Sequence, residues 1–327
     1  MSAALSLGLI GCGRVAERFY LAALPRLNEA RLVAVADPRP ERRQLIASRS
    51  PGCVAYASAE ELIAQARVAA IVIAVPTAMH APIATLALRA CIPVLVEKPL
   101  ASSPAEAEQL QATSPAADRL VMVAFNRRFW DPIRRLRDIL HEQRGPVSAR
   151  LLMSADRRIW APISEQSDPL DDLGSHQLDL LRFLFGRELE SIRARWIEPH
   201  TIRMRMALAG DLTAECVAAH AERSEESITV HCDARMYYIR RGSERIAPPV
   251  GRWRSALDAA GTLGRRLRRQ PSSLRRSYEH QLRYFLNCVR AKAVPQPTIT
   301  DGLAVARAMQ AARWSAAHDE QEVRLTG

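Results

Sequence analysis

The first 125 residues alternate short apolar runs with longer amphipathic stretches. Five of the runs are apolar on both faces, as strands are in a parallel sheet that helices cover on each side. In chain order they read LSLGLI, RLVAVA, VAAIVIAV, PVLVE and RLVMVAF. Because a stretch with helical character separates each run from the next, the pattern predicts βαβ units that build a doubly wound parallel sheet.

The pattern changes after Arg128. From Val147 onward the candidate strands alternate apolar and polar residues, and in IRMRMAL at 202–208 the apolar side chains face one way and the arginines the other. Such alternation is typical of an antiparallel sheet with one face turned to solvent or to a partner. Helical patterns interrupt and then follow these strands at residues 173–185, 277–290 and 301–318.

The length of 327 residues suits two domains of ordinary size. We predict an N-terminal Rossmann domain with a doubly wound parallel sheet over residues 1–123. An α+β domain with a large open, mainly antiparallel sheet is predicted over residues 124–327, with its C-terminal helices as candidates to pack back on the first domain.

A glycine-rich loop follows the first strand candidate. Residues 11–16, GCGRVA, read as GxGxxA at the start of a helix. The glycines permit a tight turn and let a pyrophosphate approach the backbone, where the free N–H groups and the helix dipole favour an anion. The loop therefore predicts a dinucleotide site that includes Gly11, Cys12, Gly13, Arg14 and Val15.

An acidic residue, Asp37, ends the second strand candidate 21 residues after Ala16. At this position a carboxylate accepts hydrogen bonds from the ribose hydroxyls and repels a 2′-phosphate. The sequence therefore favours NAD over NADP as cofactor. Three nearby arginines, Arg39, Arg42 and Arg43, keep NADP open as an alternative.

Lys98 stands where the fifth strand candidate ends. Only Lys98 and Lys292 are lysines among 46 basic residues, so arginine supplies almost all of the surface charge. Ligands bind at the carboxyl edge of such sheets, and a lysine can release a proton there whereas an arginine cannot. We interpret Lys98 as a catalytic candidate; the alternative is an ordinary solvated lysine.

A second group of candidates lies in the helical pattern at 173–185 and just before it. Asp172 and His176 are four residues apart, which places them on one face of a helix, so the carboxylate can orient the imidazole. Asp179 is the second candidate for the orienting carboxylate, or it pairs within the structure. A histidine on an amphipathic helix that only packs or lies at the surface is the plainer alternative.

Five motifs together identify the chain as similar to a known family. GLIGCGRVAE, AVPTAMH, PVLVEKPL, AFNRRF and DDLGSHQLDLLRFLFG occur in this order, and they resemble the glucose-fructose oxidoreductase/inositol dehydrogenase (Gfo/Idh/MocA) family. The resemblance implies NAD(P)-dependent oxidation or reduction of a CH–OH group in sugars and cyclitols. It also implies an open sheet that often serves oligomerisation, here a homodimer or homotetramer.

The resemblance also assigns roles to residues. It implies catalytic roles for Lys98, His176 and Asp172 and a cis bond between Lys98 and Pro99. The implied cofactor-binding residues beyond the glycine loop and Asp37 are Pro76, Thr77, His80, Glu97 and Lys98. The implied substrate-binding residues are Lys98, Asn126, Arg127, Trp160, Asp172 and His176, of which Asn126, Arg127 and Trp160 have packing or surface roles as an equal alternative.

The sequence departs from the family pattern at two places. Asp168-Pro169-Leu170-Asp171 stands where a glycine run commonly precedes the aspartate, which leaves the substrate open. Thr77 replaces an asparagine that is frequent near the nicotinamide.

The net charge of +11 is concentrated in one segment. Residues 240–276 hold eleven arginines against Glu244 and Asp258, a local +9, while the rest of the chain is near neutral. No nucleic-acid-binding signature accompanies this charge. We interpret the segment as recognising an anionic part of the substrate, most plausibly the diphosphate of a nucleotide-linked sugar. The alternatives are a solvated surface, or contact with an acidic membrane surface or partner.

Cysteines and hydropathy do not suggest metal, export or membrane insertion. The six cysteines contain no CxxC pair, and Cys216 and His220 lie about 13 Å apart if their segment is a strand, so the group Cys216, His220, His231 and Cys232 does not predict zinc. No apolar run reaches the roughly 18 residues of a membrane span, and no signal peptide is recognisable. We expect a cytoplasmic protein with reduced thiols.

Two other functions remain open at this point. The first is a glycoside hydrolase or eliminase of the same fold, which uses NAD transiently and regenerates it in each turnover. The second is a dinucleotide-binding sensor without catalysis. The presence of both Lys98 and His176 favours the dehydrogenase.

Overall fold

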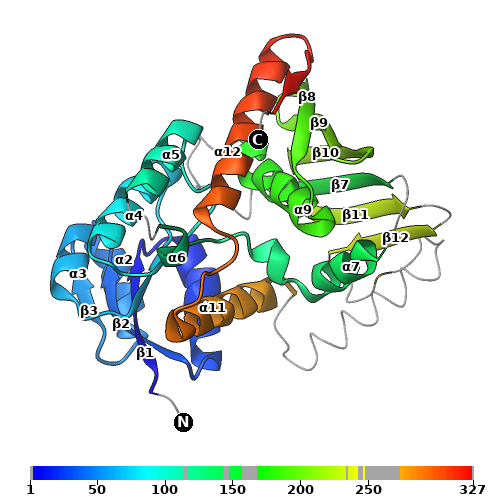
Figure 1. Ribbon diagram of the computed structural model, residues 1–327. Coiled ribbons are helices and arrows are strands. Elements are labelled where there is room, and N and C mark those ends of the chain that lie inside the picture. The colour runs from blue at the N-terminus through cyan, green and yellow to red at the C-terminus, as the bar shows by residue number, and fades with distance from the viewer. Residues whose placement is uncertain are drawn as a thin grey trace. The chain divides into compact units, whose positions relative to one another are not determined.

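The computed structural model describes residues 3–113, 117–142, 147–156, 168–232, 235–241, 246 and 273–325 (Figure 1). The chain divides into two compact units. The Rossmann unit comprises Met1–Asn126 and Arg275–Ala306, and the sheet unit comprises Arg127–Leu274 and Arg307–Gly327. The first boundary therefore lies three residues after the predicted one, and part of the C-terminal region belongs to the N-terminal unit.

The Rossmann unit contains a six-stranded, entirely parallel sheet in the order β3-β2-β1-β4-β5-β6. Five of its strands confirm the five predicted runs, and β4, β5 and β6 are shorter than predicted. The sixth, β3, was not predicted because it has only three residues at the sheet edge and its Val54 is exposed. The strands are β1 (Leu5–Ile10), β2 (Ala30–Ala36), β3 (Val54–Tyr56), β4 (Ala70–Ile73), β5 (Val94–Val96) and β6 (Val121–Val123).

Helices connect these strands, and their start signals are readable. Ser58 and Ser103 each accept a hydrogen bond from the backbone N–H of a glutamate three residues later, which caps the first turn of α3 and α5. The helical elements are η1 (Ala16–Tyr20), α1 (Leu21–Ala23), η2 (Leu24–Arg26), α2 (Pro40–Ser48), α3 (Ala59–Gln65), η3 (Thr77–Met79), α4 (His80–Arg89), α5 (Pro104–Ala112) and α6 (Ala117–Leu120), and the short turn η4 (Asn126–Phe129) follows β6.

The long helix α11 (Ser273–Ala291) packs within the Rossmann unit from Arg275 onward. Its Tyr278 ring stacks on Phe19 with the centroids 4.3 Å apart, and Arg283 pairs with Glu29 at 3.1 Å. The sequence pattern predicted this helix and the next, α12 (Ile299–Ala317), to within a few residues. The apolar face of such a helix packs against other elements of the same chain, and for α11 this element is η1, which holds Phe19.

The sheet unit is built on a seven-stranded sheet in the order β12-β11-β7-β10-β9-β8-β13. All neighbouring strands are antiparallel except β7 and β10, which confirms the predicted mainly antiparallel sheet. The strands are β7 (Val147–Asp156), β8 (Leu189–Glu198), β9 (Thr201–Leu208), β10 (Leu212–Ala221), β11 (Glu225–Cys232), β12 (Arg235–Arg240) and β13 (Val323–Arg324).

The strand order makes the chain cross over the end of β7. Strands β10 and β11 are consecutive in the sequence but flank β7 on either side, so residues 222–224, here called the arch, pass over the carboxyl end of β7. Ser154 ties the arch down, because its hydroxyl donates to the Arg223 carbonyl at 2.8 Å and accepts from the Glu225 amide at 3.0 Å. The Ser224 hydroxyl accepts from the Asp156 amide at 2.9 Å.

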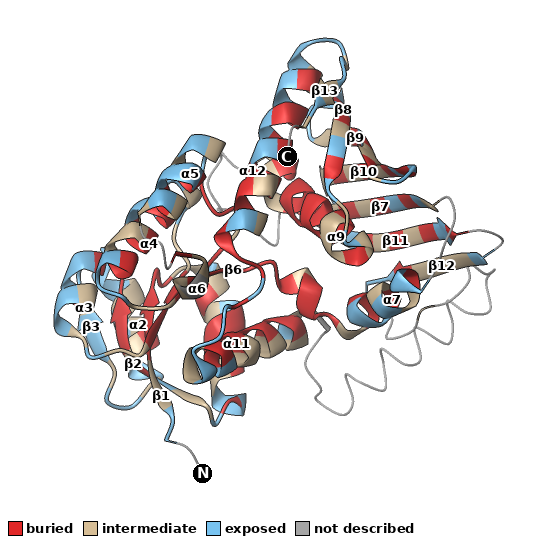
Figure 2. Ribbon diagram, in the orientation of Figure 1, coloured by how far each residue is buried: buried red, intermediate tan, exposed pale blue. Residues whose placement is uncertain are grey.

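One face of this sheet is buried and the other is polar. In β9 the residues Ile202, Met204, Met206 and Leu208 are buried, as the alternation predicted, and Figure 2 shows the same alternation along the neighbouring strands. Helix α9 (Ser175–Phe185) lies on the buried face, where the Gln177 amide donates to two strand carbonyls, those of Leu151 and Val217.

The opposite face of the sheet carries ion pairs such as Arg205 with Glu215 at 3.3 Å.

The homodimer or homotetramer that the family resemblance implies stays a prediction. Among the described residues, no helix combines the length and the apolar composition that crossing a bilayer requires.

Helix α7 (Asp131–His141) also belongs to the sheet unit and packs against α9. The turn that precedes α9 was not predicted. It is a π-helical turn, η5 (Leu170–Gly174), so the helical segment begins three residues earlier than the expected start at 173.

Candidate functional site

The glycine loop after β1 has the conformation that a dinucleotide site needs. Gly11 has φ +91°, and a Cβ atom there would lie 2.2 Å from the Ala74 carbonyl oxygen, so only glycine fits. A Cβ atom on Gly13 would meet nothing within 4 Å. The space beside Gly13 is therefore free for a pyrophosphate, and the residues present fit an NAD-type cofactor.

Asp37 is already organised by the loop and by its own neighbour. Its Oδ2 accepts a hydrogen bond from the Cys12 amide at 2.8 Å, and Arg39 donates to both carboxylate oxygens at 2.9 and 3.1 Å. Burial works to raise the pKa of the Asp37 carboxyl, but the hydrogen bonds from Arg39 and Cys12 outweigh it and hold the pKa below its ordinary value. Asp37 is therefore ionised at neutral pH.

The other two arginines near Asp37 bind the backbone rather than its carboxylate. Arg42 donates to the Cys12 carbonyl at 2.8 Å and pairs with Glu17 at 3.0 Å. Arg43 donates to the Asp37 carbonyl at 3.1 Å. Both arginines therefore brace the backbone of the site, whereas Arg39, whose side chain is 56% exposed, binds the carboxylate itself.

The carboxyl ends of β4 and β5 are tied together by His80. Its Nδ1 lies 2.6 Å from the Pro99 carbonyl and its Nε2 lies 2.9 Å from the Val75 carbonyl. Burial lowers the pKa of His80 although both hydrogen bonds act to raise it. His80, predicted as a cofactor contact, thus links the turn that holds Pro76 and Thr77 to the Lys98-Pro99 segment.

Glu97 is a second internal brace of the same edge. Its carboxylate accepts hydrogen bonds from the Tyr20 hydroxyl at 2.8 Å and from the Lys98 amide at 3.2 Å. The Lys98–Pro99 bond is cis, as the family resemblance implied. Glu97 therefore sets the backbone from which the partly exposed Lys98 side chain projects.

The Rossmann sheet brings the glycine loop and Lys98 to one edge. Ile10, Ile73 and Val96 are in register across the parallel strands β1, β4 and β5. Because neighbouring strands lie about 4.8 Å apart, the segment after β5 is roughly 10 Å across the sheet from the segment after β1. The predicted cofactor residues from these strands therefore share the carboxyl edge of one sheet.

In the sheet unit, the π-helical turn η5 holds Asp172. The geometry of this turn explains the presence of Gly174 within it and of Asp168 just before it. A Cβ atom on Gly174 would lie 2.7 Å from the Leu170 side chain and 3.4 Å from that of Met204, so glycine lets the turn lie close to β9. Asp168 caps the turn, because its carboxylate accepts from the Asp171 amide at 2.9 Å.

The acidic residues that replace the family's glycine run have a common partner, Arg313 of α12. Arg313 lies 2.6 Å from the Asp168 carboxylate and 2.7 Å from that of Asp171. Burial lowers the pKa of Arg313, but these two carboxylates outweigh it and raise the pKa above its ordinary value. A doubly paired arginine thus holds the turn in place, which the sequence alone did not reveal.

Asp172 contacts a histidine that the sequence did not assign to the site. Its Oδ2 lies 3.4 Å from Nε2 of His220 on β10. His176, on the first turn of α9, is buried. The proposed pairing of Asp172 with His176 stays a prediction. In the sequence, His220 is noticeable only as a member of the Cys/His group that does not predict zinc. In the described part of the chain, no group of three or more His, Cys, Asp or Glu is arranged to hold a metal.

Asp179, the alternative orienting carboxylate, is part of a buried ion pair. Arg128 donates to its two oxygens at distances between 2.6 and 3.1 Å, and both side chains are almost inaccessible to solvent. This favours the second interpretation of Asp179, a structural pair. Asn126 likewise makes a buried hydrogen bond, to the Ser277 hydroxyl at 2.9 Å, and Trp160 lies outside the described residues.

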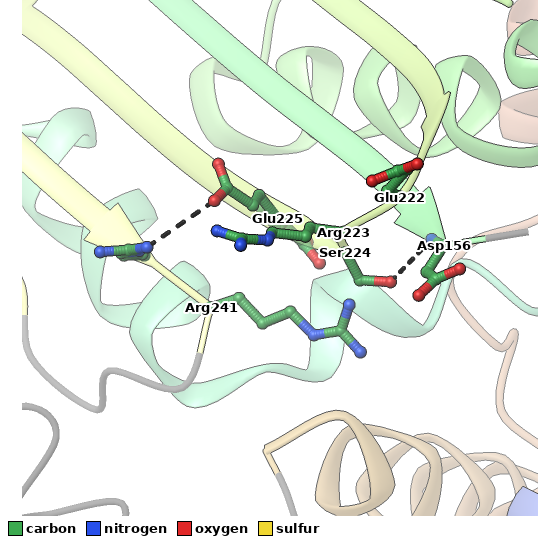
Figure 3. Close-up of a pocket in the computed structure, with 8 residues that line it drawn as sticks. Asp156, Glu222, Arg223, Ser224, Glu225 and Arg241 are labelled. Atoms are coloured by element: carbon green, nitrogen blue, oxygen red, sulfur yellow. Dashed lines mark hydrogen bonds and ion pairs between the residues drawn. The ribbon is translucent and has the colours of Figure 1, made fainter. Parts of the chain in front are cut away.

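Arg127 pairs with a residue that lines a polar pocket beside the arch. It pairs with Glu226 on β11 at 3.2 Å, and Glu226 lines a pocket of about 410 Å³ (Figure 3). Figure 3 shows the Arg241 side chain extending along the pocket toward the side where Ser224 and Asp156 lie. The pocket mixes carboxylates, guanidinium groups and a hydroxyl, a set that offers both donors and acceptors to a polyhydroxylated or charged ligand.

Two residues of the arginine-dense segment, Arg240 and Arg241, line this pocket, and Arg240 lies 4.0 Å from Glu225. Most of residues 240–276, including Arg265, Arg266, Arg268 and Arg269, lies outside the described residues.

Comparison with known proteins agrees with the geometry. Residues 5–125 match the family described as "Oxidoreductase family, NAD-binding Rossmann fold", Gfo/Idh/MocA. Inositol 2-dehydrogenase 4 of Saccharopolyspora erythraea is 34% identical over 194 residues, which cover 58% of this chain and 57% of that enzyme. The match thus spans less than three fifths of that relative. Inositol 2-dehydrogenase of Leifsonia xyli subsp. xyli is 27% identical over 318 residues, 94% of this chain and 91% of the enzyme.

Solved structures show the same fold over the whole chain. The crystal structure of myo-inositol dehydrogenase from Lactobacillus casei in complex with NAD(H) and myo-inositol superposes with a TM-score of 0.78 at 18% identity, covering 99% of this chain and 97% of that one. The glycine loop, the Lys98 edge and the match over residues 5–125 lead to one conclusion: the Rossmann unit of this chain is similar to the Gfo/Idh/MocA family of oxidoreductases in its NAD-binding Rossmann fold.

Proposed function

We propose that this protein is an NAD-dependent dehydrogenase that oxidises a secondary hydroxyl group of a cyclitol or sugar, with inositol as the first substrate to test. The proposal is supported by the names of the relatives, which are inositol dehydrogenases. It covers the reverse reduction as well, because the residues do not set the direction.

The observation that carries the proposal is the place of Lys98. It follows β5 at the same sheet edge as the glycine loop, its backbone is braced by Glu97, and its neighbour Pro99 is held by His80. A proton-releasing amine held at the edge where ligands bind suits a reaction that removes hydride and proton from one hydroxyl-bearing carbon.

The roles of the side chains follow from the chemistry of alcohol oxidation. NAD, when bound by the glycine loop and Asp37, supplies the hydride acceptor. Lys98 donates a hydrogen bond to the reacting oxygen and lowers its proton affinity. His176 takes the hydroxyl proton, and Asp172 orients the imidazole and stabilises its charge. Asp172 also keeps a contact with His220.

We further propose that the arch pocket of the sheet unit binds a polar or anionic part of the substrate. Arg240 and Arg241 make a phosphate or carboxylate on that part acceptable, which keeps nucleotide-linked sugars among the candidates.

The test is a substrate panel with purified protein and NAD: myo-inositol, scyllo-inositol, a neutral hexose, a sugar phosphate, a nucleotide diphosphate sugar and a chromogenic glycoside. We expect NADH to form in a one-to-one ratio with oxidised product. Cleavage of the glycoside without net NADH would instead support the NAD-using hydrolase. Binding of NAD without turnover on any compound would support the sensor.

We expect NAD to bind at least about tenfold more tightly than NADP, because bringing a 2′-phosphate to an ionised carboxylate costs several kcal/mol. Isothermal titration with both cofactors measures this. The Asp37→Ser variant should lose the preference, since Arg39, Arg42 and Arg43 remain, whereas Glu41→Gln, a nearby control, should keep it. Equal or reversed affinities in the parent protein would mean that the arginines dominate the site.

A further inference from the structure

Three carboxylates lie close together in the turn before α9, and they have different partners. Asp168 and Asp171 both bind Arg313 at 2.6 and 2.7 Å. Asp172 lies 3.4 Å from His220 of β10. The carboxylate with the proposed catalytic role is thus the one that contacts an ionisable side chain of the sheet.

His220 is held firmly where it meets Asp172. It is in register with Ala155 of β7, and its backbone amide donates to the His200 carbonyl at 2.9 Å. Only 6% of its side chain is exposed, against 38% for Asp172. The histidine is therefore fixed by the sheet, while the carboxylate is open on one side to a ligand.

The surroundings of the imidazole favour one protonation form. Its Nε2 lies 3.4 Å from an oxygen of the Asp172 carboxylate, a charge contact that is longer than the hydrogen bonds of the neighbouring turn. An ionised carboxylate only accepts, so this contact favours a proton on Nε2. Its Nδ1 is buried and has no hydrogen-bond partner among the described residues. A proton on Nδ1 would be a buried donor without an acceptor, which is costly, so of the two imidazole tautomers the one with its proton on Nε2 is favoured.

We infer that His220 is a positioning residue for the reaction, which keeps its Nε2 against the Asp172 carboxylate and holds that carboxylate oriented for its work with His176. The inference rests on the proposed function in one respect, the role of Asp172. It adds a residue from β10 to a site that the family motif places on the turn and helix alone.

The first test compares two substitutions of His220 in the NAD-bound enzyme. His220→Phe fills a similar volume without a polar nitrogen, and we expect kcat to fall about 10- to 100-fold, because Asp172 loses the polar contact that orients its carboxylate. NAD affinity and the melting temperature should stay near those of the parent. His220→Gln retains an N–H donor and should recover most of kcat.

His231 provides the matched control. It lies on β11 in register with Ser148, seven residues along β7 from Ala155, or about 23 Å at ~3.3 Å per residue. His231→Phe and His231→Gln should both leave kcat unchanged. Parent-like kcat in a folded His220→Phe enzyme would overturn the inference, as would equal losses in His220→Phe and His220→Gln.

The second test needs no turnover. In protein labelled with ¹⁵N-histidine, the nitrogen shifts of His220, assigned from the His220→Gln spectrum, should report the Nε2–H form. Asp172→Asn should move these shifts and leave those of His231 in place. An Nδ1–H form, or shifts that ignore Asp172→Asn, would overturn the contact itself. An inactive parent enzyme with the expected shifts would instead contradict the proposed function and leave the pair standing.

Discussion

Lys98→Ala and His176→Ala are each expected to lower turnover at least about 100-fold while NAD affinity changes little, because each removes a group that exchanges or polarises the proton of the reacting hydroxyl. Steady-state kinetics on the substrate that the panel identifies, together with calorimetric NAD titration, measure both quantities. In the proposed mechanism the two groups act on one hydroxyl, so the double variant should lose less than the product of the two single effects.

The chain offers a matched control for the lysine. Lys98→Arg keeps the positive charge but not the compact amine that can release its proton, so it should also be inactive. Lys292→Arg makes the same change at the only other lysine and should leave turnover unchanged. Near-normal turnover in Lys98→Ala or His176→Ala would remove the proposed role of that residue.

Asp179→Asn is expected to lower the free energy of unfolding of the sheet unit by about 3–5 kcal/mol, because it leaves the buried guanidinium of Arg128 without its counter-charge. The pair is among the most buried ionic contacts of the chain, with Asp179 inaccessible and Arg128 8% exposed. Urea unfolding followed by circular dichroism measures the loss.

Glu188→Gln is the control, because it removes one carboxylate charge from a similar two-bond pair with Arg182 whose glutamate is 64% exposed. It should cost less than about 1 kcal/mol. Equal losses in the two variants would contradict the assignment of Asp179 to a buried structural pair. A stable Asp179→Asn protein with greatly reduced turnover would return Asp179 to the role of orienting carboxylate.

The cofactor site could be predicted from the sequence, because its residues directly follow strands that the sequence marks. The glycines of residues 11–13 and Asp37 follow two neighbouring strands, and hydrophobic runs mark both strands in the sequence. Their nearness follows from the parallel order of the sheet, which the βαβ pattern dictates. What the sequence did not show is that His80 and Glu97 brace the backbone around Lys98.

Side-chain pairs between distant segments could not be predicted from the sequence. Arg128 and Asp179 are 51 residues apart, and Arg313 and Asp168 are 145 apart, so no local period links them. In both cases the sequence does not distinguish the paired arginine from the many others, because arginines supply nearly all the positive charge of the chain. Which arginine is buried and paired depends on helix packing, because a guanidinium becomes a structural element only after its surroundings exclude water.

The sequence by itself determined the two sheets, the alternation of their buried faces and the glycine loop, because each depends on residues within one strand period or one turn. It also located Lys98, Asp172 and His176 through a family resemblance. Only the tertiary structure decided that Asp172 meets His220. That contact exists because β10 lies beside β7 in the sheet and the turn before α9 packs against both strands. The order of the strands is set by the packing of the whole sheet rather than by any local pattern.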